Sequence, residues 1–281
     1  MTKPLNEKLI QLPGKNPNDS QLVITAGPPG SGKNFVIDKF TNATNLFKEL
    51  DVDKIKLIVL DSEKLSRKFL DWVRENHPDN LYSTYTMLEF HKKKELLKDP
   101  RLSTLLHDFV TELQLPEKRI DLIMKNKSKD NLPNIIVNTT FGDAIKSLGK
   151  IEKFHERGYK PENTHMVWVF NTFDDSLKNN FSRLRREDED YIKDNYRKIF
   201  RSLFYQIIGE PTSGRFVNMI QGNIWIVLNK RSFVTYYPDS DLIDNFYYIK
   251  VRQKGKWDSE AIKELTHWIE DNIKSETIWG D

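Results

Sequence analysis

The chain of 281 residues contains no cysteine. Disulfide bridges and thiolate zinc sites are therefore excluded, and the absence suits a reducing compartment. The chain also lacks any run that approaches the ~18 apolar residues of a membrane span. Residues 1–21 have no apolar segment of the kind that a secretory signal needs. From these absences we expect a cytoplasmic protein with no membrane partner.

An excess of charge of one sign is also missing. The 44 Lys and Arg residues and 41 Asp and Glu residues give a net charge of +3, which neither requires nor excludes a nucleic acid partner. The six histidines show no metal-ligand spacing, and no serine-hydrolase elbow is present. Aromatic residues make up 11% of the chain, enough for a substantial core.

One glycine-rich stretch organises the chain. It follows an apolar run at 22–24 and fits the G-x-x-x-x-G-K pattern of a phosphate-binding loop. Its residues are Gly27, Pro28, Pro29, Gly30, Ser31, Gly32 and Lys33. Glycines let backbone N–H groups curl round an anion, and the next helix presents free N–H groups and its positive dipole end. Lys33 would supply a full positive charge at the β- and γ-phosphates of a nucleotide.

Asn34 departs from this pattern, because Ser or Thr normally follows the lysine and gives a hydroxyl to Mg²⁺. An amide oxygen can also bind a hard cation, so Asn34 is a candidate magnesium ligand. ATP and Mg²⁺ are the predicted cofactors. An ordinary glycine-rich turn between a strand and a helix is the alternative.

Further along the chain, buried apolar runs alternate with helical patterns. This order predicts an α/β fold, a P-loop kinase-like parallel sheet with helices on both faces. The predicted strands are 21–26, 56–60, 134–138 and 165–170. Prolines divide a set of polar helices at about 76–133, which we interpret as a helical insertion. Residues 1–20 read as an irregular lead-in, and residues from about 214 to 281 as a β-rich and helical extension of the domain.

Polar residues follow two of these strands. Asp61 and Glu63 come after the second strand, and Asn138 and Thr140 come at the end of the third. Ligands of such sheets bind at the carboxyl ends of the strands. One of the two acids could orient an acceptor hydroxyl while the other holds Mg²⁺ through water, and Asp61 is a candidate for either role. Alternatively, both acids merely favour the start of the next helix.

Two basic clusters have two interpretations each. Arg183, Arg185 and Arg186 could neutralise γ-phosphate charge, or they could form a solvated helix end beside the acidic run 187–190. The run 91–94, His-Lys-Lys-Lys, is a solvated helix face or a contact for a polyanion.

Four stretches together resemble the zeta-toxin family of P-loop kinases. They are the loop 27–33, the apolar run with its acids at 58–65, the segment 134–140, and Arg157-Gly158-Tyr159 with the strand 166–170. The resemblance covers about residues 20–208. It implies that Glu63 takes the place of the catalytic acid and that Asn138 and Thr140 take those of substrate-binding residues. Arg183 and Arg186 fall near the family's phosphate-clamping arginines.

The departures from the family suggest an altered acceptor. Glu63 is one methylene longer than the family's Asp, and Asn138 removes a charge from the substrate pocket. We therefore predict an ATP-dependent phosphotransferase that moves the γ-phosphoryl group to a hydroxyl of a nucleotide-like acceptor. A polynucleotide or modified-base DNA or RNA kinase is one alternative. A non-catalytic nucleotide-binding interaction module is another, for which Asn34 and Asn138 argue. An antitoxin partner and the oligomeric state are left open.

Overall fold

The computed structural model describes residues 3–4, 10–13, 19–41, 43, 46–91, 99–125, 127–128, 131–182, 187–208, 214–229 and 246–279. The chain divides into two compact units. The first, which we call the sheet unit, comprises residues 1–49, 126–179 and 189–281. The second, the helical unit, comprises residues 50–125 and 180–188.

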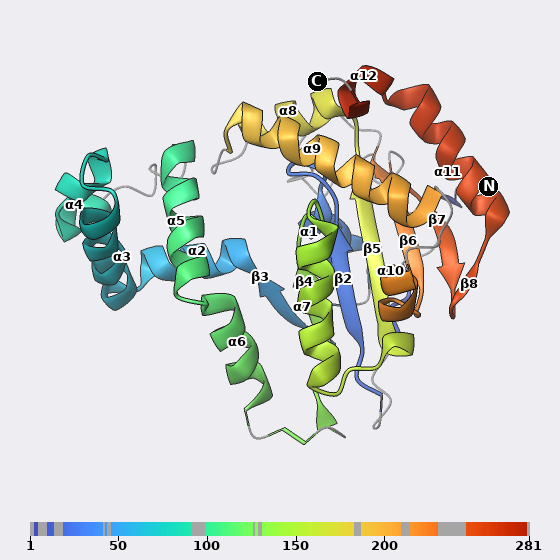
Figure 1. The fold of residues 1–281 in the computed structure, drawn as a ribbon, viewed down its shortest axis with the longest axis horizontal. Helices are drawn as coiled ribbons and strands as arrows, with labels where there is room; N and C mark the ends of the chain where they lie inside the picture. The colour runs from blue at the N-terminus through green and yellow to red at the C-terminus, as the bar shows by residue number, and fades with distance from the viewer. Residues whose placement is uncertain are drawn as a thin grey trace. The chain divides into compact units, whose positions relative to one another are not determined.

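The described strands form one eight-stranded sheet, in the order β1-β7-β6-β5-β2-β4-β3 with β8 paired to β7 (Figure 1). Strand β2 lies between β4 and β5 and is parallel to both, and β5 is parallel to β6. This mostly parallel arrangement confirms the predicted α/β class. The strands are β1 Lys3–Pro4, β2 Leu22–Ala26, β3 Lys48–Asp51, β4 Ile135–Asn138, β5 Thr164–Phe170, β6 Ile224–Asn229, β7 Phe246–Gln253 and β8 Lys256–Trp257.

Alternation along the strands buries both faces of the sheet. On one face, Val23 of β2 and Val167 of β5 pack with Val36 of helix α1 (Lys33–Phe40). On the other face, Phe170 of β5 packs against Phe200 of α9 (Glu189–Leu203), with ring centroids 4.7 Å apart. Figure 1 shows α7 (Ala144–Glu156) and α9 on this near face. A sheet covered on both sides explains why its central strands are almost wholly apolar.

Local signals set the ends of the sheet unit's helices. Asp143 accepts a hydrogen bond from the Lys146 N–H and caps α7, and Gly158, with φ 112°, follows the helix end. The other helices of this unit are α8 Phe173–Ser182, α10 Gly214–Met219, α11 Ser259–Asn272 and α12 Ser275–Trp279, with the π-turn Phe204–Ile208 and the short 3₁₀ turn Pro161–Asn163. Within the described ranges, no helix has both the length and the apolar character needed to cross a bilayer.

The helical unit is built round aromatic side chains. Phe69 packs against Phe90 and Phe109 at centroid distances of 5.6 and 5.3 Å, and the Trp72 indole donates to Glu112 at 2.8 Å. Its elements are α2 Val52–Asp61, α3 Glu63–Asn76, the 3₁₀ turn Leu81–Thr84, α4 Met87–His91, α5 Pro100–Glu112 and α6 Leu115–Met124. The unit begins at Leu50, upstream of the insertion predicted at 76–133.

The strand predicted at 56–60 was wrong, because these residues belong to helix α2. Ile55 and Val59, four residues apart, are buried, whereas Leu57 and Ile58 are about half exposed. A short apolar run has this ambiguity, since it suits either a buried strand or one face of a helix. The strand that follows α1 in the chain is instead β3, which contains only one strongly apolar residue, Leu50.

Candidate nucleotide site

The glycine-rich loop leaves the carboxyl end of β2 in a conformation that other residues rarely adopt. Gly27, Gly30 and Gly32 have φ values of 133°, 84° and 90°. The Ser31 N–H donates to the Pro28 carbonyl at 3.2 Å and closes a turn, and the Gly27 N–H donates to the Thr140 carbonyl at 3.0 Å. Each glycine occupies a backbone position at positive φ that an L side chain would strain, while phosphate binding by the loop stays a prediction.

Neighbouring backbone also excludes larger residues from the loop. A Cβ atom on Gly30 would lie 2.5 Å from the Ser176 carbonyl oxygen of α8, and one on Gly27 would overlap the Val169 carbonyl. Close packing of the loop against β5 and α8 thus requires glycine at both positions, 27 and 30.

Lys33 begins helix α1 and turns back over the loop. Its Nζ donates to the carbonyl oxygens of Gly27 at 2.8 Å and Pro28 at 3.0 Å. Gly32 stands at the N-cap without a side-chain cap, and no acid occupies the first turn of α1. The lysine charge and the positive end of the helix dipole therefore lie on the same short segment, which is the arrangement that attracts phosphate.

Asn34 and Asn138 are joined directly, although 104 residues separate them. The Asn138 Nδ2 donates to the Asn34 Oδ1 at 2.5 Å, and the Thr25 hydroxyl donates to the Asn138 Oδ1 at 3.0 Å. The β2–β4 register places Thr25 opposite Asn138. Two of the three residues that depart from the zeta-toxin pattern thus form one amide pair beside the loop. Thr25 was not singled out from the sequence.

Thr140 reaches the loop through its backbone carbonyl, as described above for the Gly27 N–H. The next residue, Phe141, has φ 60° and is fully buried against Trp168, with centroids 5.5 Å apart. A buried aromatic side chain in this unusual conformation anchors the segment after β4. The predicted substrate residues Asn138 and Thr140 therefore adjoin the loop, whereas their contact with a substrate stays a prediction.

Asp61 and Glu63 do not follow a strand, which removes the argument that selected them. Asp61 is the last residue of α2, and Glu63 is the first residue of α3. The Glu63 carboxylate pairs with Arg67 at 3.0 Å on an exposed helix surface. Ser62 caps α3 by accepting from the Leu65 N–H. A catalytic role for either acid, or a role for Asp61 in holding Mg²⁺, stays a prediction based on the resemblance alone.

Two other acids, Asp51 and Asp53, lie at or just after the end of the strand that follows α1, where the catalytic acids were expected. Asp51 ends β3, is buried, and accepts the Asp53 N–H at 2.8 Å as the N-cap of α2. Asp53 lies 3.7 Å from the ammonium of Lys56, whose side chain is buried. The signal in the sequence was an Asp-x-Asp spacing before a helix, and it was missed because Lys48–Asp51 does not read as an apolar strand.

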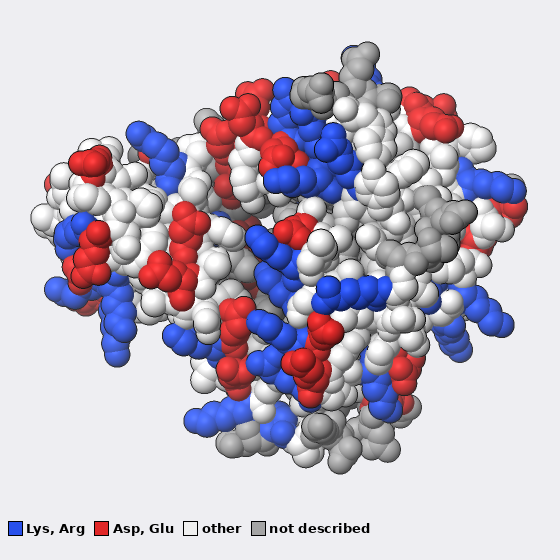
Figure 2. Space-filling model, in the orientation of Figure 1, with Lys and Arg blue, Asp and Glu red and all other residues white. Residues whose placement is uncertain are grey.

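The predicted clamping residues Arg183 and Arg186, with Arg185, lie outside the described residues. So do Lys92, Lys93 and Lys94 of the basic run, while its first residue, His91, ends α4. On the face drawn in Figure 2, Lys and Arg side chains are interspersed with Asp and Glu side chains. The mixture agrees with the near balance of charges in the sequence.

The amide oxygen of Asn34 was the predicted magnesium ligand in the loop region. An amide oxygen is an acceptable ligand for a hard cation, but here it accepts the Asn138 hydrogen bond. Metal binding at Asn34 would compete with the Asn138 hydrogen bond for this oxygen. Within the described ranges, no three His, Asp or Glu side chains are grouped as a metal site.

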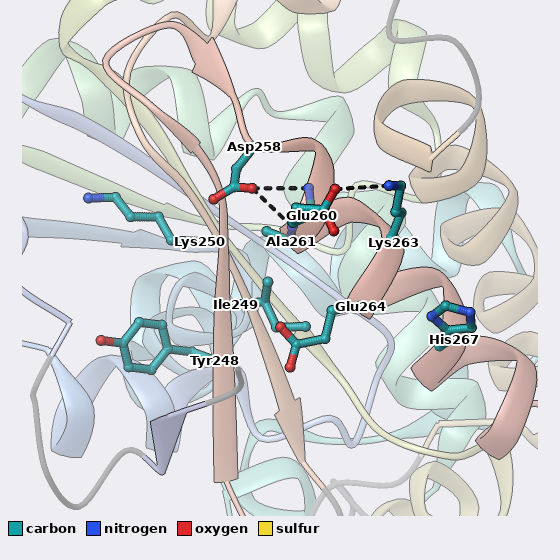
Figure 3. A pocket seen from close by; sticks show the side chains of 9 residues that line it. All are labelled: Tyr248, Ile249, Lys250, Asp258, Glu260, Ala261, Lys263, Glu264 and His267. Atoms are coloured by element: carbon teal, nitrogen blue, oxygen red, sulfur yellow. Dashed lines mark hydrogen bonds and ion pairs between the residues drawn. The ribbon is translucent and has the colours of Figure 1, made fainter.

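A separate pocket of about 700 Å³ lies between β7 and α11 (Figure 3). Its acids have local structural roles: Asp258 caps α11 by accepting from the N–H groups of Glu260 and Ala261, both at 3.1 Å. Glu260 pairs with Lys263 at 2.8 Å. Lys250 lies 5.5 Å from the Trp225 ring centroid, and burial lowers its pKa. These contacts give the polar side chains named here structural roles where α11 begins against β7.

The fold and the loop together define a P-loop α/β domain: β2 is central in the sheet, the glycine loop follows it, and α1 begins with the lysine. No protein-family model matches the chain, and no curated protein matches its sequence.

Among solved structures, the chain is similar to AvrRxo1-ORF1:AvrRxo1-ORF2 with ATP, at 13% identity and a TM-score of 0.42, over 92% of this chain and 72% of that one. It is also similar to the PezAT chromosomal toxin-antitoxin system of Streptococcus pneumoniae, at 13% identity and a TM-score of 0.39, over 92% of this chain and 88% of that one. Both likenesses are too remote to transfer a function.

Proposed function

We propose that this chain is an ATP-dependent kinase that resembles the zeta-toxin family and transfers the γ-phosphoryl group to a hydroxyl of a nucleotide-like acceptor. The observation that supports this most is the loop. Three glycines at positive φ, a lysine ammonium folded over the loop, and an uncapped helix N-terminus coincide within Gly27–Lys33. Each of these features favours a bound phosphate chain.

In the proposed reaction, the loop N–H groups and Lys33 hold the β- and γ-phosphates. The acceptor oxygen forms a bond to the γ-phosphorus while the bond from that phosphorus to the β,γ-bridging oxygen breaks, and ADP leaves with the electron pair. The acceptor proton passes to a carboxylate. Asp53, Asp61 and Glu63 are the candidates for this base, and Asp53 is the one that follows a strand. Bound Mg²⁺ would neutralise phosphate charge.

Equilibrium binding of ATP tests the loop. Replacing Lys33 by Ala removes a charge-assisted contact to phosphate, and we expect about a 10- to 100-fold loss of ATP affinity by calorimetry. Lys150→Ala, at an exposed position of α7, is the matched control and should bind ATP like the parent. A Lys33→Ala protein that binds ATP as tightly as the parent would remove the loop assignment.

A transfer screen tests the chemistry. γ-Labelled ATP is offered with nucleotide sugars, nucleosides and oligonucleotides, beside Asp53→Asn, Asp61→Asn and Glu63→Gln. The variant that loses transfer but keeps ATP binding identifies the base. Transfer to an oligonucleotide alone would favour the polynucleotide kinase.

A non-catalytic nucleotide-binding module is the second candidate, and the Asn34–Asn138 pair favours it. The pair engages the amide oxygen that would otherwise be offered to Mg²⁺. ATP binding without transfer to any member of the panel would support this candidate over the kinase.

A further inference from the structure

Three buried asparagines donate hydrogen bonds to carbonyl groups of the glycine-rich loop. Asn179 Nδ2 and Asn171 Nδ2 both reach the Gly30 oxygen, at 2.8 and 3.3 Å, and Asn229 Nδ2 reaches the Ser31 oxygen at 3.2 Å. The three side chains are 4%, 0% and 1% exposed. They come from three places in the fold: α8, the residue after β5, and the last residue of β6.

The sheet topology explains why these amides converge. Strands β2, β5 and β6 are parallel neighbours, so their carboxyl ends share one edge of the sheet. The loop leaves β2 at this edge, while Asn171 and Asn229 stand at the ends of the other two strands. Helix α8 then brings Asn179 against the same loop. The three hydrogen bonds therefore join residues that are 141, 149 and 198 positions apart in the sequence.

Other contacts hold the Asn171 amide in its orientation. The Ser176 hydroxyl donates to the Asn171 Oδ1 at 2.7 Å, so the Nδ2 faces the loop. The Tyr196 hydroxyl donates to the Asn171 backbone carbonyl at 2.9 Å. The Ser176 bond at Oδ1 makes the side-chain amide a rigid donor, because turning it would leave buried polar atoms without partners, and the Tyr196 bond holds the backbone of the same residue.

Fixing a carbonyl also fixes the N–H group of the next residue. A trans peptide is planar, and its C=O and N–H bonds point in opposite directions. When Asn229 holds the Ser31 carbonyl, the Gly32 N–H points away from Asn229. The Gly30 carbonyl, held by Asn171 and Asn179, likewise fixes the Ser31 N–H, which donates to Pro28 and closes the turn.

We propose that Asn171, Asn179 and Asn229 are positioning residues that hold the loop in its anion-binding shape before a ligand arrives. The ligand class is a nucleoside di- or triphosphate, so this role rests on the proposed function. Asn229 aims the Gly32 N–H, at the N-cap of α1, towards the phosphates. A loop already in the bound shape loses less freedom on binding, which increases affinity.

The simpler explanation is that the asparagines only satisfy buried carbonyls and stabilise the fold. The two explanations differ in what an apolar replacement does to phosphate binding in a folded protein. Asn134 provides the matched control, since it is 2% exposed and its Oδ1 accepts the Gln21 N–H at 2.9 Å, at the amino end of β4. Asn134→Leu and Asn229→Leu remove similar buried amides at opposite ends of parallel strands.

The experiment compares ADP affinity, by calorimetry, in the parent, Asn229→Leu, Asn179→Ala and Asn134→Leu. We expect Asn229→Leu to weaken ADP binding about 10- to 100-fold, the range for losing one well-aimed N–H donor to a charged group. Asn179→Ala should weaken it less, because Asn171 still holds the Gly30 carbonyl. Asn134→Leu should bind like the parent.

Nuclear magnetic resonance gives a second measurement that a purely structural role would not affect. In the parent, ADP should move the Gly32 amide resonance strongly, and in folded Asn229→Leu this shift should be reduced. If Asn229→Leu fails to fold, the milder Asn179→Ala tests the role through ADP affinity, because it removes one of the two donors to the Gly30 carbonyl. Equal ADP affinity and equal Gly32 shifts in the parent and the folded variants would overturn the positioning role alone. A parent chain that does not bind ADP would overturn the proposed function and this role with it.

Discussion

Replacing Gly30 by Ala tests the loop geometry most directly. With φ at 84°, an alanine would adopt a left-handed conformation, which costs about 1–2 kcal/mol. Its Cβ would also lie 2.5 Å from the Ser176 carbonyl oxygen and 3.2 Å from the carbonyl carbon and Cα of Ser176. These are backbone atoms of α8, so they cannot move as a flexible side chain could. Overpacking of this kind adds about 1–3 kcal/mol.

Together these effects predict that Gly30→Ala lowers the free energy of unfolding by about 2–5 kcal/mol. Urea unfolding followed by circular dichroism measures this loss, and calorimetry should show ATP affinity reduced at least about tenfold, because Gly30 shapes the loop. Gly149→Ala is the control. Gly149 lies inside α7, where an added Cβ would meet nothing within 4 Å, so alanine should stabilise that helix by about 0.5–1 kcal/mol. Gly30→Ala with the parent's urea midpoint and ATP affinity would refute the geometric argument.

Two further predictions concern titration and metal. Burial lowers the pKa of His165 to about 4, and its neutral ring bonds Gln21 and the Asn223 N–H. Its contribution is complete above pH 6.5 and is lost as the pH falls towards 4, by about 3 kcal/mol in all. His165→Leu should therefore flatten the fall in unfolding free energy between pH 7 and 4. The control His267→Leu, at an exposed site, should not change this slope. An unchanged slope in His165→Leu would contradict the argument. Asn34→Thr restores a hydroxyl and removes the hydrogen bond to Asn138. Mg²⁺ should therefore raise the ATP affinity of this variant by a larger factor than it does in the parent, as measured by calorimetry with and without Mg²⁺. Equal factors would count against Asn34 as a metal position.

Much of the sheet unit could be predicted from the sequence because its signals are local. The apolar runs at 22–24, 135–137 and 165–170 are buried parallel strands, and the loop glycines take the positive φ angles that only glycine adopts without strain. Glycine spacing and continuous apolar runs depend on backbone sterics and burial, which act over a few residues.

The second strand could not be read in the same way. Lys56–Leu60 is as apolar as a buried strand, yet it forms α2 with Ile55 and Val59 inward. Strand β3 has the composition of an exposed segment, since three of its four residues are charged. Leu50 and Asp51 are nevertheless buried. Asp61 and Glu63 were therefore chosen about ten residues downstream of Asp51 and Asp53, which lie at or just after the end of the strand, and their catalytic role stays a prediction.

The asparagines that donate hydrogen bonds to the loop could not be predicted from the sequence either. Asn171, Asn179 and Asn229 have no motif in common, and their importance comes from contacts made across more than 140 residues. A polar residue at the end of a buried strand is a weak signal. Only the register of β2, β5 and β6 turns it into a position beside the loop.

Within the described residues, the side chains that donate hydrogen bonds to the loop carbonyls are the Lys33 ammonium and three asparagine amides. Asn171, Asn179, Asn229 and the Asn34–Asn138 pair do not gain or lose protons across the physiological range. The framework around the loop therefore keeps its shape when the acidity of the solution changes. The pH dependence of nucleotide affinity should then report mainly on the phosphates of the ligand.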